Sequence, residues 1–215
     1  MKILLLSLLL SAFPLLLPAA DGPYAAAMQA ALTDLRNGKS ADDFQAVANR
    51  LERIASAEPG EWLPAYWAAY CYNTMSFMDK DDDRRDQLLD KADALLGESE
   101  KRNGRDADVY ILKAYVAQAR MAISPATRLM TYGSVVDENL AKAEKLNPGN
   151  PRLYYLRGMS VYYKPEMFGG GKNAAKPLLK TALDKYAAFR PASDIHPNWG
   201  QPRCQKMYEQ CNRAE

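Results

Sequence analysis

One short segment has the glycines and the lysine that phosphate-binding loops use. In residues 169–172 (Gly-Gly-Gly-Lys), backbone N–H groups and a lysine ammonium could surround a phosphate. Such a loop also needs a glycine where Glu166 stands and a Ser or Thr where Asn173 stands, and it must follow a strand. We therefore predict that this segment is a flexible hairpin turn that leads into a helix.

A second segment has the carboxylate spacing of a calcium loop. Asp79, Asp81 and Asp83 occupy the first, third and fifth positions of such a loop. The sixth position must be glycine for the sharp turn and is Arg84, and the last should be glutamate and is Asp90. The pattern instead favours an acidic first helical turn, because carboxylates there interact favourably with the helix dipole. We predict no metal site in this segment.

The residues that most often bind zinc or act as nucleophiles are scarce. His196 is the only histidine, and no cysteine lies beside it in the sequence to form a Cys–His pair. Cys204 and Cys211 would lie about 10 Å apart on one helix, beyond the roughly 7 Å limit for a disulfide. Because the chain has three cysteines, at least one thiol is unpaired, and we predict isolated buried thiols. A disulfide from Cys71 to the last helix is a less favoured alternative, because it requires the two ends of the protein to meet.

No two carboxylates stand out as an acid–base pair, so the sequence favours a protein that is not an enzyme and has no cofactor. An enzyme with carboxylates in an unrecognised arrangement is the alternative. The 28 basic and 26 acidic residues give a net charge of +2, and they are interspersed without a basic tract. This distribution lacks the electrostatic footprint of a nucleic-acid-binding protein, so we predict no nucleic acid partner.

The first twenty residues differ in composition from the rest. Lys2 precedes an apolar run over residues 3–17 that ends in small residues at 18–20 (Pro-Ala-Ala). This order is typical of a secretory signal peptide, and we predict cleavage after Ala20. The run is too short to span a bilayer and contains Pro14, although an uncleaved anchor is the alternative. No cysteine lies near the cleavage position, which argues against a lipoprotein anchor. We expect a mature chain over residues 21–215 that is exported, periplasmic or alternatively secreted, without stable membrane insertion.

The rest of the chain repeats at a regular interval. Tyr66 follows Tyr24 by 42 residues, and Tyr110 and Tyr154 follow at steps of 44. Each tyrosine opens a helical run, and a second run with Leu-x-x-(Ala/Ile) comes after it. Such a period is typical of a solenoid, in which each unit buries its apolar face against its neighbours. We predict one all-α domain with helices over residues 23–36, 42–57, 64–77, 81–99, 107–123, 125–146, 151–163, 171–189 and 202–214.

The third and fourth units resemble the tetratricopeptide repeat family. Residues 150–163 (NPRLYYLRGMSVYY) place an aromatic residue, a small residue four positions later and a further large residue as the first helix of that repeat does. Leu140, Ala143 and Pro148 match the end of its second helix. The resemblance covers roughly residues 24–191, with a period longer than the family's own. It implies an α-solenoid of about four antiparallel helix pairs with a C-terminal capping helix.

The repeat register also predicts a binding surface. If Tyr66, Tyr110 and Tyr154 are equivalent, one set of largely apolar and aromatic side chains faces the concave groove of the solenoid. Such a surface suits an extended or helical peptide, so the leading prediction is a non-enzymatic exported scaffold that binds a protein or peptide. The alternative is a small-molecule-binding accessory of a solute-uptake system in the cell envelope. The predicted groove residues are Trp67, Ile111, Tyr115, Gln118, Tyr155, Met159 and Tyr162, with Cys71 beside them.

Overall fold

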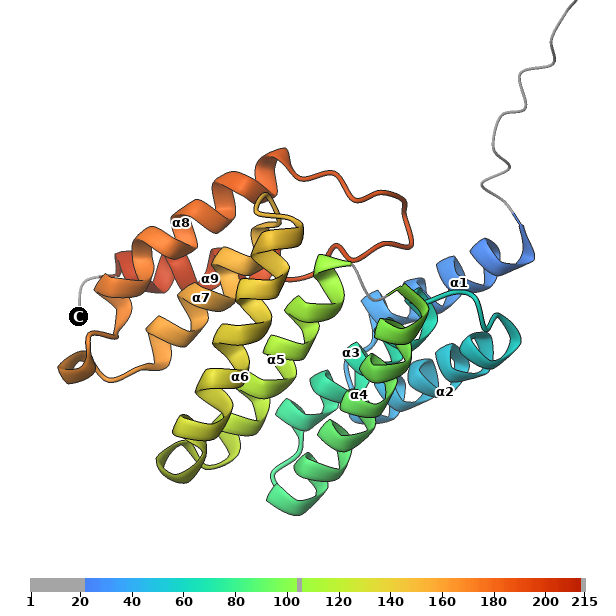
Figure 1. The fold of residues 1–215 in the computed structure, drawn as a ribbon, viewed down its shortest axis with the longest axis horizontal. Helices are drawn as coiled ribbons and strands as arrows, with labels where there is room; N and C mark the ends of the chain where they lie inside the picture. Colours follow the sequence, from blue (N-terminus) through green and yellow to red (C-terminus); the bar gives the residue numbers. More distant parts are fainter. Residues whose placement is uncertain (1–21, 104–105, 214–215) are drawn as a thin grey trace, which may run out of the picture.

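The computed structural model describes residues 22–103 and 106–213, and within them the chain is helical without a strand (Figure 1). This confirms the all-α prediction for these two ranges. The predicted signal peptide, residues 1–20, lies outside them. None of the described helices is long and apolar enough to cross a membrane. The helices are α1 (Pro23–Asn37), α2 (Ala41–Ala57), α3 (Leu63–Met78), α4 (Asp82–Asn103), α5 (Ala107–Ile123), α6 (Pro125–Leu146), α7 (Pro151–Tyr163), α8 (Lys172–Ala188) and α9 (Gln201–Asn212), with a short 3-10 helix, η1 (Glu166–Phe168), between α7 and α8.

Helices that are neighbours in the sequence pack in pairs. The pairs are α1 with α2, α3 with α4, α5 with α6 and α7 with α8, and the first helices of the last three pairs also contact one another in a row (Figure 1). The second helices bury the predicted small and large apolar residues Leu89 and Ala92, Leu140 and Ala143, and Leu179 and Ala182. That these pairs form a tetratricopeptide superhelix stays a prediction.

The evenly spaced tyrosines do not occupy equivalent environments. Tyr66 is fully buried, whereas Tyr110 and Tyr154 are half-buried. In α7 the next residue, Tyr155, is the one that fills the core, with 1% of its surface exposed. The tyrosine period therefore locates equivalent helices along the chain, but it does not fix which side chain each helix turns inward.

After α8 the chain turns back across the first helices of the pairs. Residues 189–200, which we name the crossing segment, contact the N-terminal parts of α3 and α7. Trp67 donates its indole N–H to the carbonyl of Ile195 at 2.8 Å, and Trp199 donates its own to the Tyr66 hydroxyl at 2.7 Å. The hydroxyl of Tyr186 on α8 donates to the Trp199 carbonyl at 3.0 Å. The crossing segment is thus hydrogen-bonded both to α3 and to α8.

A buried arginine provides the central contact of this arrangement. Arg152 has no exposed surface, and its Nη2 lies 2.7 Å from Oδ1 of Asp108. Its Nη1 donates to the Pro197 carbonyl at 2.9 Å, and its guanidinium lies 4.8 Å from the ring centre of Phe189 and 5.7 Å from that of Trp199. One side chain therefore joins α5, α7 and the crossing segment.

Replacing Arg152 by Met tests that role. A buried ion pair that loses one partner leaves the other charge uncompensated, so Arg152→Met should lower the free energy of unfolding by about 3–5 kcal/mol. Arg157→Met is the matched control, because the pair of Arg157 with Glu144 is partly exposed and should contribute about 1 kcal/mol or less. Urea denaturation followed by circular dichroism measures both. Equal effects of the two substitutions would contradict the central role of Arg152.

The crossing of α7 and α8 depends on Gly158, as the repeat pattern predicted. A Cβ atom at this position would lie 2.8 Å from Cδ2 of Leu179 and 3.0 Å from its Cγ. Helices approach this closely only where one of them has a very small residue.

Gly158→Leu should therefore destabilise the protein. Overpacking of this kind typically costs about 1–3 kcal/mol, so the melting temperature should fall by several degrees. Gly97→Leu is the control, since a Cβ at Gly97 on α4 meets no atom within 4 Å. Thermal denaturation of the two variants should separate them. If Gly158→Leu has the same melting temperature as the wild type, the α7–α8 crossing is not as close as described.

Candidate functional site

The predicted groove is covered in the structure by the chain's own C-terminal part. Six of the seven predicted residues are less than 9% exposed, and the seventh, Tyr162, is half-buried. The expectation of an open aromatic groove is therefore corrected, because the crossing segment lies against Trp67, Tyr115 and Tyr155, and α7 covers Gln118. A binding role for these residues stays a prediction. The six buried residues are Trp67, Ile111, Tyr115, Gln118, Tyr155 and Met159.

An aromatic stack runs from the crossing segment along the row of first helices. Trp199 stacks on Tyr115 of α5 with ring centres 5.3 Å apart, and Tyr115 stacks on Phe77 of α3 at 5.5 Å. The first two rings are buried and Phe77 is half-buried. The stack therefore leads from the buried rings of Trp199 and Tyr115 to the ring of Phe77, which solvent reaches.

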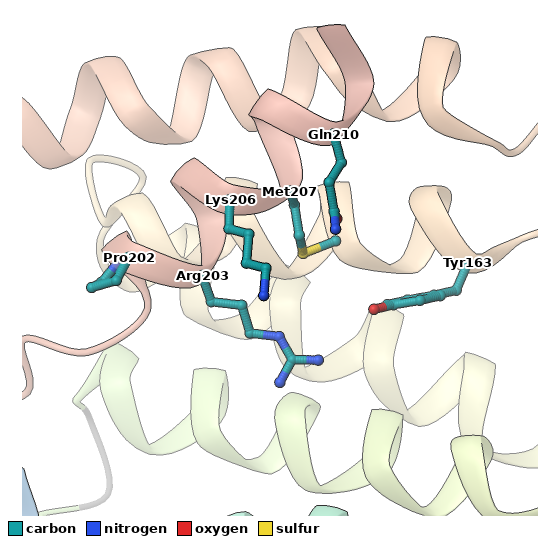
Figure 2. Close-up of a pocket in the computed structure, with 6 residues that line it drawn as sticks. All are labelled: Tyr163, Pro202, Arg203, Lys206, Met207 and Gln210. Atoms are coloured by element: carbon teal, nitrogen blue, oxygen red, sulfur yellow. The ribbon is translucent and has the colours of Figure 1, made fainter. Parts of the chain in front are cut away.

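A cleft opens between α9 and the end of α7. It has a volume of about 500 Å³, which lies within the range of small-molecule sites. In Figure 2 the α9 side chains point into this space from one side, and the ring of Tyr163 reaches in from the other. We name it the α9 cleft; its lining residues are Tyr163, Pro202, Arg203, Lys206, Met207 and Gln210.

The sequence of α9 explains why these side chains share one side of the helix. Arg203, Lys206 and Gln210 follow at intervals of three and four residues, which place side chains on one helical face. Cys204 and Cys211 are buried and have free thiols, in agreement with the prediction for the cysteines. The helix thus packs through its small apolar face and presents its polar face to the cleft.

Gly200 determines how the chain enters α9. Its φ is +103°, in the region that residues with a side chain rarely adopt. A Cβ there would lie 2.4 Å from the Tyr186 hydroxyl oxygen and 3.2 Å from Tyr155. Glycine is therefore needed both for the turn and for the close approach of the backbone to α7 and α8.

Arg203 connects the cleft to the aromatic stack. It donates to the Tyr115 hydroxyl at 3.5 Å, and its guanidinium lies 5.7 Å from the ring centre of Phe77. Burial alone would lower the pKa of Arg203, but the phenol groups of Tyr115 and Tyr155 and a hydrogen bond with Tyr163 raise it. Arg203 is therefore a permanent cation beside aromatic rings, and Lys206 adds a second charged group one turn along α9.

The segments that suggested metal or phosphate chemistry have structural roles. Asp79 accepts hydrogen bonds from Arg84 at 3.0 and 3.1 Å and from the backbone N–H of Asp81 at 2.9 Å. These bonds, that of Arg84 first, lower the pKa of Asp79 to about 2. Among the described residues, no group of three or more His, Cys, Asp or Glu is arranged to hold a metal ion. His196 shares a hydrogen bond with Ser193 at 2.7 Å in the crossing segment.

A second hollow lies between α1 and α2, and three of its charged residues have partners within the protein, while Arg53 also lines it. Asp34 and Arg50 line it and form an ion pair at 2.6 Å. Asp43, also in the lining, accepts from the backbone N–H groups of Lys39 and Ser40 at the start of α2. The α9 cleft, which combines two cations with the aromatic ring of Tyr163, is the better candidate site.

Sequence reasoning missed the α9 cleft, although a local signal for it exists. The sequence predicts only that the C-terminal helix caps the stack. The spacing of Arg203, Lys206 and Gln210 indicates a basic face on a short helix. Their position opposite Tyr163 depends on how α9 packs, which no local pattern indicates.

Comparison with protein-family models and with curated proteins finds no match. Among solved structures, the chain is similar to the HusA haemophore from Porphyromonas gingivalis, with a TM-score of 0.79 and 30% sequence identity. The similarity covers 90% of this chain and 94% of the haemophore chain. It therefore extends over nearly the whole of both proteins.

Substitution of two tyrosines tests whether the predicted groove is closed, because one of them belongs to that groove and the other lines the α9 cleft. Tyr155→Ala removes a ring that is 1% exposed, and loss of a buried aromatic ring typically costs about 3–5 kcal/mol of stability. Tyr163 is 64% exposed, so Tyr163→Ala should change stability by about 0.5 kcal/mol or less. Urea denaturation of both variants checks this. A Tyr155→Ala protein as stable as the wild type would instead favour the open groove.

Proposed function

Since the chain belongs to the family of the HusA haemophore, we propose that it is a non-enzymatic binding protein that carries haem or a closely related porphyrin. The observation that supports this most directly is the α9 cleft, which places two cations next to aromatic and apolar side chains. The cleft is where we propose that the porphyrin binds.

The chemistry of the ligand matches the lining of the cleft. Haem is a flat, largely apolar ring system that carries two carboxylates on one edge. Tyr163 and Met207 offer an aromatic ring and a thioether to the flat face. Arg203 and Lys206 offer two cations to the two carboxylates, and arginine pairs especially well with a carboxylate. Because the cleft contacts the ring and its carboxylates, a porphyrin without iron should bind as well.

The peptide-binding scaffold, which the sequence favoured, has less support than the small-molecule alternative. A peptide would need the concave face along α3 and α5, and the crossing segment lies there with its indole and carbonyl groups hydrogen-bonded to α3. A porphyrin needs only the space at the end of α7. We therefore favour the small-molecule alternative, and we propose a porphyrin as the small molecule.

We also propose that the protein is exported, as a carrier of an extracellular nutrient must be. The support is the order of residues 1–20, with a basic residue, an apolar run and small residues. N-terminal sequencing of the mature protein tests this proposal, and a chain that still begins at Met1 would contradict it.

Titration of the protein with haemin and with metal-free protoporphyrin tests the binding proposal. Absorbance changes and quenching of tryptophan fluorescence should both saturate. The variant R203Q/K206Q should bind each porphyrin about tenfold more weakly, because two partly exposed contacts with carboxylates together contribute about 1.4 kcal/mol.

The control is K142Q/K145Q, which removes the same two charges at the same spacing from exposed positions on α6. It should bind as the wild type does. If the wild type binds neither porphyrin, the proposed function is wrong. If R203Q/K206Q and K142Q/K145Q bind equally well, a porphyrin site exists but is not the α9 cleft.

A further inference from the structure

The loop between α7 and α8 exposes two large apolar side chains at its tip. Met167 is 83% exposed and Phe168 is 60% exposed, both within η1. We name these two residues the apolar tip. Figure 1 shows this loop at one end of the long axis of the molecule, far from α1. The tip is therefore placed where another surface can reach it.

The loop that carries the apolar tip is tightly closed. The N–H of Gly170 donates to the Pro165 carbonyl at 3.2 Å, and that of Gly171 donates to the Val161 carbonyl at 2.9 Å. Gly169 and Gly171 have φ values of +78° and +92°, which favour glycine. A Cβ at Gly170 would lie 2.1 Å from the Lys164 carbonyl oxygen. Three successive glycines thus allow a closed turn that holds the apolar tip away from the core.

The charge around the apolar tip is positive. Lys164 precedes the loop, and Lys172 and Lys176 lie in the first turns of α8. The acid within the loop, Glu166, has its side chain at the base, because a Cβ on Gly171 would lie 2.6 Å from its Cγ. The loop and the first turns of α8 thus carry three lysines and one carboxylate, Glu166, whose side chain lies against Gly171.

The small size and the charge of this feature identify its partner. A stable protein interface buries about 800 Å² on each partner, far more than two side chains provide. Two apolar side chains on a closed loop, with lysines before and after the loop, instead suit the boundary between lipid head groups and acyl chains. Lysines near such a boundary are attracted to anionic lipids. We propose that the apolar tip docks this protein on an anionic membrane surface.

Flotation with lipid vesicles tests this inference and does not depend on the proposed porphyrin binding. The wild type should float with vesicles of phosphatidylglycerol and phosphatidylethanolamine in equal parts, and it should not float with phosphatidylcholine alone. The variant M167S/F168S should partition at least about tenfold less, because it has lost the apolar groups that enter the bilayer. The variant K164Q/K176Q should bind more weakly and lose most of the sensitivity to salt.

The control is L129S/M130S, which changes another adjacent pair of exposed apolar residues, 50% and 86% exposed on α6. It should float as the wild type does. Unchanged circular dichroism and porphyrin titration of M167S/F168S should show that its fold is intact. A wild type that stays unbound to anionic vesicles, or an M167S/F168S variant that floats equally well, would overturn the inference.

Discussion

The arrangement of the C-terminal third depends on the buried guanidinium of Arg152. A charge without access to water is stable only where partners replace its hydration, and here Asp108, the Pro197 carbonyl and two aromatic rings do so. These partners come from α5 and from the crossing segment, so satisfying one charge requires three parts of the chain to meet. The helical pairs could stack without this contact, but the crossing segment that leads into α9 would lose its anchor on α5 and α7.

The position of α9 in turn forms the cleft that we propose as the ligand site. The crossing segment fills the part near the N-terminal ends of α3, α5 and α7, where Trp67 and Trp199 take part in its hydrogen bonds. The other part stays accessible at the end of α7, and α9 supplies it with Arg203 and Lys206. At the end of α7 the accessible space is a cleft of small-molecule size.

Local patterns were sufficient to predict the helices but not the site. Helices α5, α6 and α7 begin and end at the predicted residues, because Pro125, Pro151 and the Asn-Pro-Gly segment before it interrupt the chain locally. The register that starts from Tyr154 predicts an open groove at Tyr155, whereas the segment that covers this residue lies far along the sequence. The cleft was missed for the same reason. Its parts come from α7 and α9, and only tertiary packing brings them together.

The hydrogen bonds of the crossing segment also set an order of assembly. Most helices pack against sequence neighbours, and such local contacts form rapidly because little chain entropy is lost. Trp67 and Ile195 are 128 residues apart, and Tyr66 and Trp199 are 133 apart, so these bonds close very large loops. They can form only after almost the entire polypeptide has been synthesised. A nascent or truncated chain would therefore stack its early hairpins without forming these bonds or the α9 cleft, and a formed cleft would report that synthesis has reached the last helix.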